Sequence, residues 1–194
     1  MSGRRPLEIG CKASTCNEGR PADKERHAFR SPTSALPGLG GDCINCGSDD
    51  IVDWELCHNM GPHDFATVTA ELRKELIRDN YWGLELPPHV LRKAAKRSRQ
   101  QLEVSTALTL RRALVVNHPR EGTQTTWAYN DKATIIHCAQ HATGTCCRAC
   151  IDKWFGIQPH LPLGYDWLTL LSEFAMSYVD VRLNEPVTSI LEAA

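Results

Sequence analysis

Two short cysteine pairs constrain the fold of this chain more than any other feature. Cys43-Ile-Asn-Cys46 is followed by Gly47, and Cys147-Arg-Ala-Cys150 lies in the C-terminal half. A CxxC turn offers two thiolates from one tight loop, and zinc takes four such ligands in a tetrahedron. The chain holds nine cysteines, an odd number that does not pair completely into disulfides. The pattern therefore predicts metal sites that tie distant segments together.

The length and the charge of the chain exclude few functions. A chain of 194 residues is long enough for one domain with its own core. Its net charge of −1 gives no argument for nucleic-acid or membrane binding. The N-terminus, MSGRRPLEIG, has no apolar run of the kind found in secretory signals, and no stretch approaches the roughly 20 apolar residues that span a bilayer. We expect a cytoplasmic, soluble protein with reduced thiols and no membrane contact.

The first knuckle has two candidate sets of partners. Cys11 and Cys16 complete the pattern C-x4-C-x26-C-x2-C with Cys43 and Cys46, which is close to a zinc ribbon. The competing set closes the same knuckle with Cys57 and His58. Spacing favours the first set, so we predict that zinc pins the N-terminal arm.

The second knuckle lies in a denser segment, and its ligands remain ambiguous. Its candidates are His141, Cys146 or Cys147, and Cys150, with His137 or His58 as the fourth ligand. Cys138 sits in an apolar run and is expected to be a small core residue. A redox role for the CxxC pair is the minority alternative. We therefore predict two Zn²⁺ ions per chain.

The rest of the chain predicts a mainly α fold with a small β component. Helices are expected at 64–79, 89–113, 151–155 and 166–183, from apolar spacing and from cap residues. A strand pair is expected from Val115 and Val116 and from residues 133–138. Residues 1–62 are predicted to form a zinc-ribbon-like arm packed on a helical domain at 63–194, together as one compact unit.

One stretch of the chain is strongly basic. The candidate nucleic-acid contacts are Arg92, Lys93, Lys96, Arg97 and Arg99, and Arg111 and Arg112 follow. Glu103 is the stretch's only acid. Such a face can bind phosphates, although a solvated surface helix and an acidic protein partner remain alternatives. The apolar stripe of helix 166–183 is expected to face the core, with a protein contact as the minority alternative.

The motifs give no evidence for a particular enzyme. The HCAQH segment at 137–141 lacks the glutamate of HExxH metalloproteases, and neither a zinc-deaminase signature nor a phosphate loop occurs. We therefore predict a non-enzymatic binding or adaptor module that contacts nucleic acid. The alternative is a metal-dependent hydrolase that uses His58, His137 or His141. In its nuclease form, Cys43, Cys46, Cys147 and Cys150 share one split zinc site beside His58, as in HNH-like enzymes.

The segment around the second knuckle resembles the signature of a known family. The matching residues are Ala139, Gln140, His141, Ala142, Thr143, Thr145, Cys146, Cys147, Cys150, Trp154, Gly156 and Ile157. They are similar to an AQHATxTCCxxC…W…GI pattern of a bacterial domain family of unknown function. Phe155 departs from that pattern, which is expected to carry histidine there. The HAFRSP block, the first knuckle and residues 52–55 also resemble longer members. The resemblance implies no activity.

Overall fold

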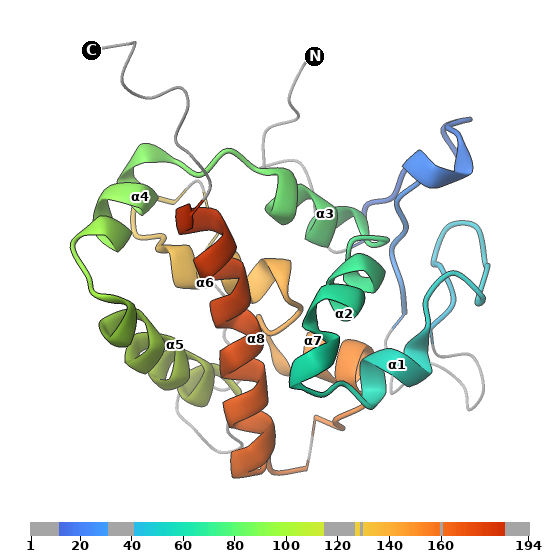
Figure 1. Cartoon of the computed structure of the whole chain (residues 1–194). Coiled ribbons are helices and arrows are strands. Elements are labelled where there is room, and N and C mark those ends of the chain that lie inside the picture. Colours follow the sequence, from blue (N-terminus) through green and yellow to red (C-terminus); the bar gives the residue numbers. More distant parts are fainter. Residues whose placement is uncertain (1–11, 31–40, 115–126, 129, 160, 185–194) are drawn as a thin grey trace.

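The computed structural model describes residues 12–30, 41–114, 127–128, 130–159 and 161–184. Within that part the chain is mainly helical, as predicted (Figure 1). Eight α-helices are present there: α1 (Trp54–His58), α2 (Phe65–Leu72), α3 (Leu76–Gly83), α4 (Pro88–Ala95), α5 (Arg99–Leu114), α6 (Ile135–Ala142), α7 (Arg148–Phe155) and α8 (Tyr165–Asn184).

Helix α6 lies at the centre of the bundle, where it packs against α3, α4, α5 and α8. The strand predicted at 133–138 is therefore wrong, because this apolar run leads into α6 and forms its first half. Thr134 begins the helix, and its backbone N–H donates to Nδ1 of His137 at 3.1 Å. A short apolar run that is buried on all sides fits a strand or a helix equally well by composition. Val115 and Val116 lie outside the described residues.

The helix predicted at 64–79 is two helices, α2 and α3. Glu75 separates them because its backbone is extended, with φ −86° and ψ 130°. In that conformation it forms an isolated parallel β-bridge with His27. The backbone N–H of His27 donates to the carbonyl of Lys74 at 2.8 Å. A contact with a distant segment thus overrides the local helical pattern.

The basic helix predicted at 89–113 is likewise divided, into α4 and α5. Ser98 makes the division through reciprocal bonds with Gln101. The Gln101 backbone N–H donates to the Ser98 hydroxyl at 3.2 Å, and the Ser98 backbone N–H donates to the Gln101 side chain at 2.9 Å. This is a capping box, which marks a helix start.

The last two predicted helices are present. Helix α7 ends as expected at Gly156, whose φ of 65° is the left-handed conformation that favours glycine at this position. Helix α8 packs on α5 and α6 and buries Leu171, Phe174 and Tyr178. The predicted apolar stripe of this helix therefore faces the core over most of its length, although Val181 near its end is exposed.

The N-terminal arm lies beside α1 and α7, on the right in Figure 1. Phe29 holds it there by packing edge-on against Trp54 and Trp154, with ring centroids 5.4 and 5.9 Å apart. In the described residues, β structure amounts to two single bridges, His27 to Glu75 and Phe29 to Cys43. None of the helices described here is both long and apolar enough to cross a membrane.

Candidate metal centres

Four side chains from the arm meet in a first cluster, namely Cys16, His27, Cys43 and Cys46. One ligand atom from each lies within 4.8 Å of all the others. Two backbone segments run side by side to bring Cys16 near His27. The N–H of Thr15 donates to the carbonyl of Arg26 at 2.7 Å, and the N–H of Arg26 donates to the Thr15 hydroxyl at 3.0 Å.

The first knuckle is shaped by its own backbone. Gly47 has a φ of 76°, and its N–H donates to the carbonyl of Cys43 at 2.9 Å. The N–H of Cys43 donates to the Ser48 carbonyl at 2.8 Å, which closes the turn. Ile44 donates to the carbonyl of Ala28 at 2.8 Å, next to His27. The knuckle is therefore fixed against the segment that carries the histidine.

The spacing of the ligand atoms in the first cluster matches a tetrahedral metal site. Sγ of Cys16 lies 3.8 Å from Sγ of Cys43, and Sγ of Cys46 lies 3.6 Å from Nδ1 of His27. A zinc ion with Zn–S bonds of about 2.3 Å and a Zn–N bond of about 2.05 Å has tetrahedral edges of about 3.8 Å and about 3.6 Å. The cluster can hold a metal ion with little rearrangement.

Neighbouring groups prepare this cluster for a metal. The carboxylate of Glu25 lies 4.0 Å from Nε2 of His27, on the far side of the ring from Cys46. Burial lowers the pKa of His27, which favours the neutral imidazole that binds metals. Burial also raises the pKa of Cys16 to about 11. A metal ion is what would make this thiol a thiolate at neutral pH.

A second cluster contains Cys146, Cys147 and Cys150, whose Sγ atoms lie within 4.8 Å of one another. Cys147 is the N-cap of α7 and Cys150 lies in its first turn, with its N–H donating to the Cys147 carbonyl at 3.1 Å. Cys146 and Cys150 are buried, and Cys147 is half-buried. This cluster, too, can hold a metal ion. All eight cysteines in the described part of the chain are free thiols.

A buried cation contacts the second cluster directly. Arg78 donates from one terminal nitrogen to Sγ of Cys150 at 3.1 Å and from the other to Sγ of Cys146 at 3.7 Å. The pKa of Cys150 lies well below its usual value. Hydrogen bonds from the thiols of Cys146 and Cys147 cause most of this shift, and the charges of Arg78 and Lys153 add to it. The surroundings of Cys150 therefore favour its thiolate form.

Glu75 balances the cations behind the second cluster. Its carboxylate accepts from Arg78 at 2.9 Å, from Lys153 at 2.9 Å and from the indole of Trp154 at 3.3 Å. All four side chains are buried. The same residue forms the bridge to His27, so Glu75 connects the surroundings of the two clusters.

Three of the four ligands predicted for the first knuckle lie in the first cluster. Cys16, Cys43 and Cys46 meet as predicted, and Cys11 lies outside the described residues. His27 supplies the fourth ligand atom, although the sequence analysis did not propose it. The sequence signal for His27 is its position between the cysteines in the spacing C-x10-H-x15-C-x2-C. His27 is also the first residue of the HAFRSP block, which resembles longer members of the family.

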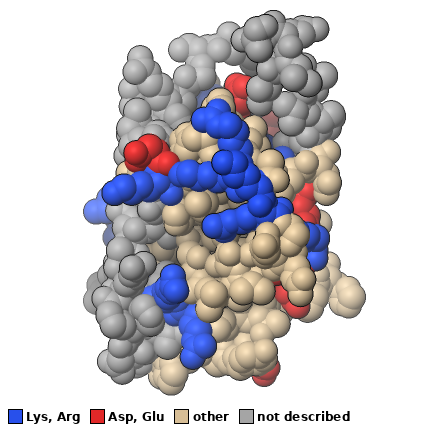
Figure 2. Space-filling view, turned by 90° about the vertical axis from the view of Figure 1, so that its left-hand side faces the viewer, with Lys and Arg blue, Asp and Glu red and all other residues tan. Residues whose placement is uncertain are grey.

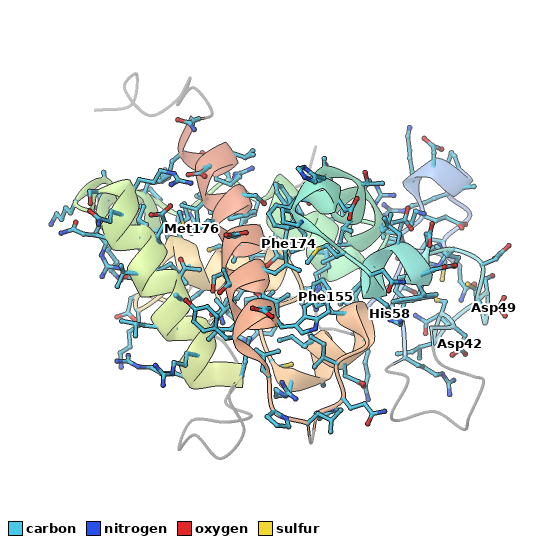
Figure 3. The ribbon with its side chains drawn as sticks, turned by 60° about the horizontal axis from the view of Figure 1, so that its bottom comes forward. Asp42, Asp49, His58, Phe155, Phe174 and Met176 are labelled. Carbon is cyan, nitrogen blue, oxygen red and sulfur yellow. The ribbon has the colours of Figure 1, made fainter. Side chains whose placement is uncertain are left out.

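The competing partners of that knuckle lie elsewhere. Cys57 is fully buried in the apolar core, and burial raises its pKa to about 12. Nε2 of His58 lies 3.3 Å from the carbonyl of Lys153. Figure 3 shows His58 on the α7 side of α1, near Phe155 and away from Asp42 and Asp49 at the edge of the arm. Neither residue joins a described cluster.

The histidines predicted for the second knuckle have other contacts. The ring of His141 stacks between Tyr81 and Trp127, with centroids 4.7 and 4.6 Å away. His137 caps α6 through its Nδ1. Cys138 is a core residue as expected, and burial raises its pKa to about 12. Cys146 and Cys147 both belong to the cluster, whereas spacing alone did not decide between them.

The two knuckles do not share one site. Cys43 and Cys46 belong to the first cluster, and Cys147 and Cys150 belong to the second. The split arrangement that an HNH-like site requires is therefore not the arrangement of these four residues.

Comparison with known proteins places the chain in a family. No solved structure matches it. The family model described as a domain of unknown function, DUF4186, matches residues 67–180, which is more than half of the chain. The match contains the whole second cluster with Glu75, Arg78 and Lys153, and it begins after the last ligand of the first cluster. The predicted resemblance to an uncharacterised family is thus confirmed, and the chain belongs to the DUF4186 family.

Proposed function

We propose that this protein is a zinc-stabilised, non-enzymatic binding module that contacts nucleic acid through α4 and the segment that joins α4 to α5. The observation that carries the proposal is a basic surface whose cations form no ion pair with an acidic side chain in the part of the chain that the structure describes. We call this surface the basic face and define it by Arg92, Lys93, Lys96 and Arg97, which are all exposed.

The proposed role of zinc follows from the first cluster. Three cysteines and one histidine at tetrahedral spacing supply all four ligands that a structural zinc ion takes. A filled coordination sphere leaves no position for a substrate, which favours a structural ion over a catalytic one. The cluster joins the two segments of the arm, so zinc there stabilises the fold.

The basic face supports the proposed partner. Among the described residues, no ion pair involves Arg92, Lys96 or Arg97. Lys93 donates to the backbone carbonyls of Asp131 and Ala133, which keeps its charge near the surface. Figure 2 shows Lys and Arg side chains gathered in a band on the side of the molecule that α4 and α5 form. Counterion release from phosphates would drive binding to such a band.

Arg99 differs from its neighbours in the predicted set. It pairs with Asp180 at 2.9 Å and with Glu103, and it thereby ties the start of α5 to α8. We therefore assign it a structural role and leave it out of the basic face.

The proposal is tested by salt-dependent binding to duplex DNA and to RNA. If the four residues each contact one phosphate, a plot of the logarithm of the affinity for duplex DNA against the logarithm of the salt concentration should have a slope of about −3.6. The triple variant Arg92→Gln, Lys96→Gln, Arg97→Gln should lose most of the binding and reduce the slope by about three. Fluorescence anisotropy at several ionic strengths measures both quantities.

A matched control has the same change in charge at a different place. Lys12, Arg20 and Lys24 are exposed on the arm, across the molecule from α4 (Figure 1). Their triple glutamine variant should bind nearly as well as the wild type. The proposal is wrong if no salt-dependent binding appears at low ionic strength, or if the two triple variants lose equal affinity.

A further inference from the structure

We propose that the second cluster binds a divalent metal ion of the zinc class through Cys146, Cys147 and Cys150 and leaves one coordination position for a small neutral ligand. This inference concerns a second site, separate from the first cluster and from the basic face. It stands or falls without the nucleic-acid proposal.

The charges around the cluster fit such an ion. Glu75 carries one negative charge, and Arg78 and Lys153 carry two positive charges, so this connected group has a net charge of +1. The buried Arg148 and Asp152 of α7 add one charge of each sign and leave this sum unchanged. A divalent ion with three thiolates has a net charge of −1. The two sets together are neutral, and neutrality matters because uncompensated charge in a buried site is costly.

The hydrogen bonds around the cluster fit metal-bound thiolates. Arg78 points one N–H group at Sγ of Cys150 and another at Sγ of Cys146. Sulfur accepts such bonds well when it carries negative charge, and outer-shell bonds of this kind orient the ligands of a metal. The N-terminus of α7 adds a favourable field, since Cys147 caps the helix and Cys150 lies in its first turn.

The fourth position is what distinguishes this site from the first. Among the described residues, no fourth Cys, His, Asp or Glu lies within the same distance of the three sulfur atoms. The ring of the nearby His141 stacks on Tyr81 and Trp127. An anionic fourth ligand would disturb the charge balance, so a neutral one such as water or imidazole fits best. Cys147 is half-buried, which gives the site a route to solvent.

The experiment uses Co²⁺ as a spectroscopic substitute for Zn²⁺ in the full-length protein. The variant Cys46→Ser, whose residue is exposed, removes one of the four ligands of the first site, so that the second site dominates the Co²⁺ absorption. Added Co²⁺ should produce thiolate-to-metal absorption in this variant, and added imidazole should shift the d–d bands. The double variant Cys46→Ser, Cys147→Ser should show neither change, while Cys46→Ser, Cys138→Ala should behave like Cys46→Ser.

Arg78 provides a second, independent readout. Arg78→Lys keeps the charge but loses the forked pair of donors, and loss of such an outer-shell partner typically weakens metal binding 10–100-fold. We expect a loss of this size in the Co²⁺ affinity of the second site, with the first site unchanged. Circular dichroism confirms that each variant remains folded.

Two results would overturn the inference. One is Co²⁺ absorption in Cys46→Ser that persists when Cys147 is also replaced, because the metal would then bind elsewhere. The other is an absorption spectrum that imidazole does not shift, because the fourth position would then be filled by the chain itself.

Discussion

Glu75 contacts the surroundings of both clusters, through its backbone on one side and its carboxylate on the other. Its backbone leaves the helical conformation to pair with His27 of the first cluster. Its carboxylate pairs with Arg78 and Lys153, two buried cations beside the second cluster. Both tasks depend on its burial, because ion pairs in a low-dielectric interior are strong only when each charge is matched.

Replacing Glu75 should therefore be costly. Glu75→Gln preserves the shape of the side chain but removes the carboxylate that pairs with two buried cations. Breaking a buried pair in this way typically costs about 3 to 5 kcal/mol. Urea denaturation of the variant and the wild type measures the difference in the free energy of unfolding. Glu103→Gln, which removes a partner from an exposed pair, is the control and should lose far less. Equal losses would show that the buried network is unimportant.

At the residue scale, the sequence indicated which cysteines lie close together, but it did not indicate which histidine joins them. CxxC spacing is local, so Cys43 with Cys46 and Cys147 with Cys150 could be paired by inspection. His27 could not be, because a contact between Thr15 and Arg26 and the bridge to Glu75 bring it to the site. His58 and His141 carried the right chemistry, but their rings lie against Lys153 and between Tyr81 and Trp127.

Among the elements, α6 shows how a helix start depends on one protonation state. His137 accepts the Thr134 N–H at Nδ1, which is available only while that nitrogen carries no proton. Burial lowers the pKa of His137 below 6.5, and the charge of Lys93 lowers it further. The folded state thus binds a proton less readily than the unfolded state, so stability is full above pH 6.5 and falls as the pH drops below it.

The variant His137→Gln isolates this effect. Glutamine at the same position can still bond to the backbone N–H of the helix start, and it does not titrate. We expect the wild type to lose stability relative to this variant as the pH falls from 7 towards 5. Thermal unfolding at several pH values measures that difference. A constant difference across the range would contradict the role assigned to His137.

Periodicity located the helices but not their ends or, in one case, their type. The breaks at Glu75 and Ser98 have different origins. Ser98 and Gln101 form a local capping box that the sequence displays. Glu75 leaves the helix for a tertiary contact that the sequence does not display. The run at 133–138 is apolar without a helical period, because α6 packs against four other helices and nearly all of its residues are buried. Such a run suggests a buried strand as readily as a buried helix.

At the scale of the whole molecule, the arm and the helices differ in what holds them together. The helices share an extended apolar core to which the segment before α1 adds little beyond Phe29 and Cys43, and the first cluster lies in that segment. We propose on this basis that the two predicted parts, residues 1–62 and 63–194, differ in stability, and that the N-terminal part is the less stable one without metal. On this proposal, a metal ion would supplement the core of the helical part and organise the arm.

Removing metal should therefore destabilise the N-terminal arm more than the helical part. A chelator should expose the arm to proteases while most of the helical circular dichroism remains, because the core of α3, α5, α6 and α8 does not depend on the first cluster. Limited proteolysis followed by mass spectrometry locates the cuts, which are expected within residues 12–58. Complete loss of helical signal on chelation would show instead that metal holds the whole fold.

Zinc content after substitution of single histidines decides whether Cys16, His27, Cys43 and Cys46 hold one zinc ion. His27→Ala and His58→Ala each remove one imidazole, and His58 stands for the competing ligand set. We predict that His27→Ala loses one zinc ion per chain by elemental analysis and that His58→Ala retains the wild-type content. Retention of zinc in His27→Ala, with or without its loss in His58→Ala, would contradict the proposed centre.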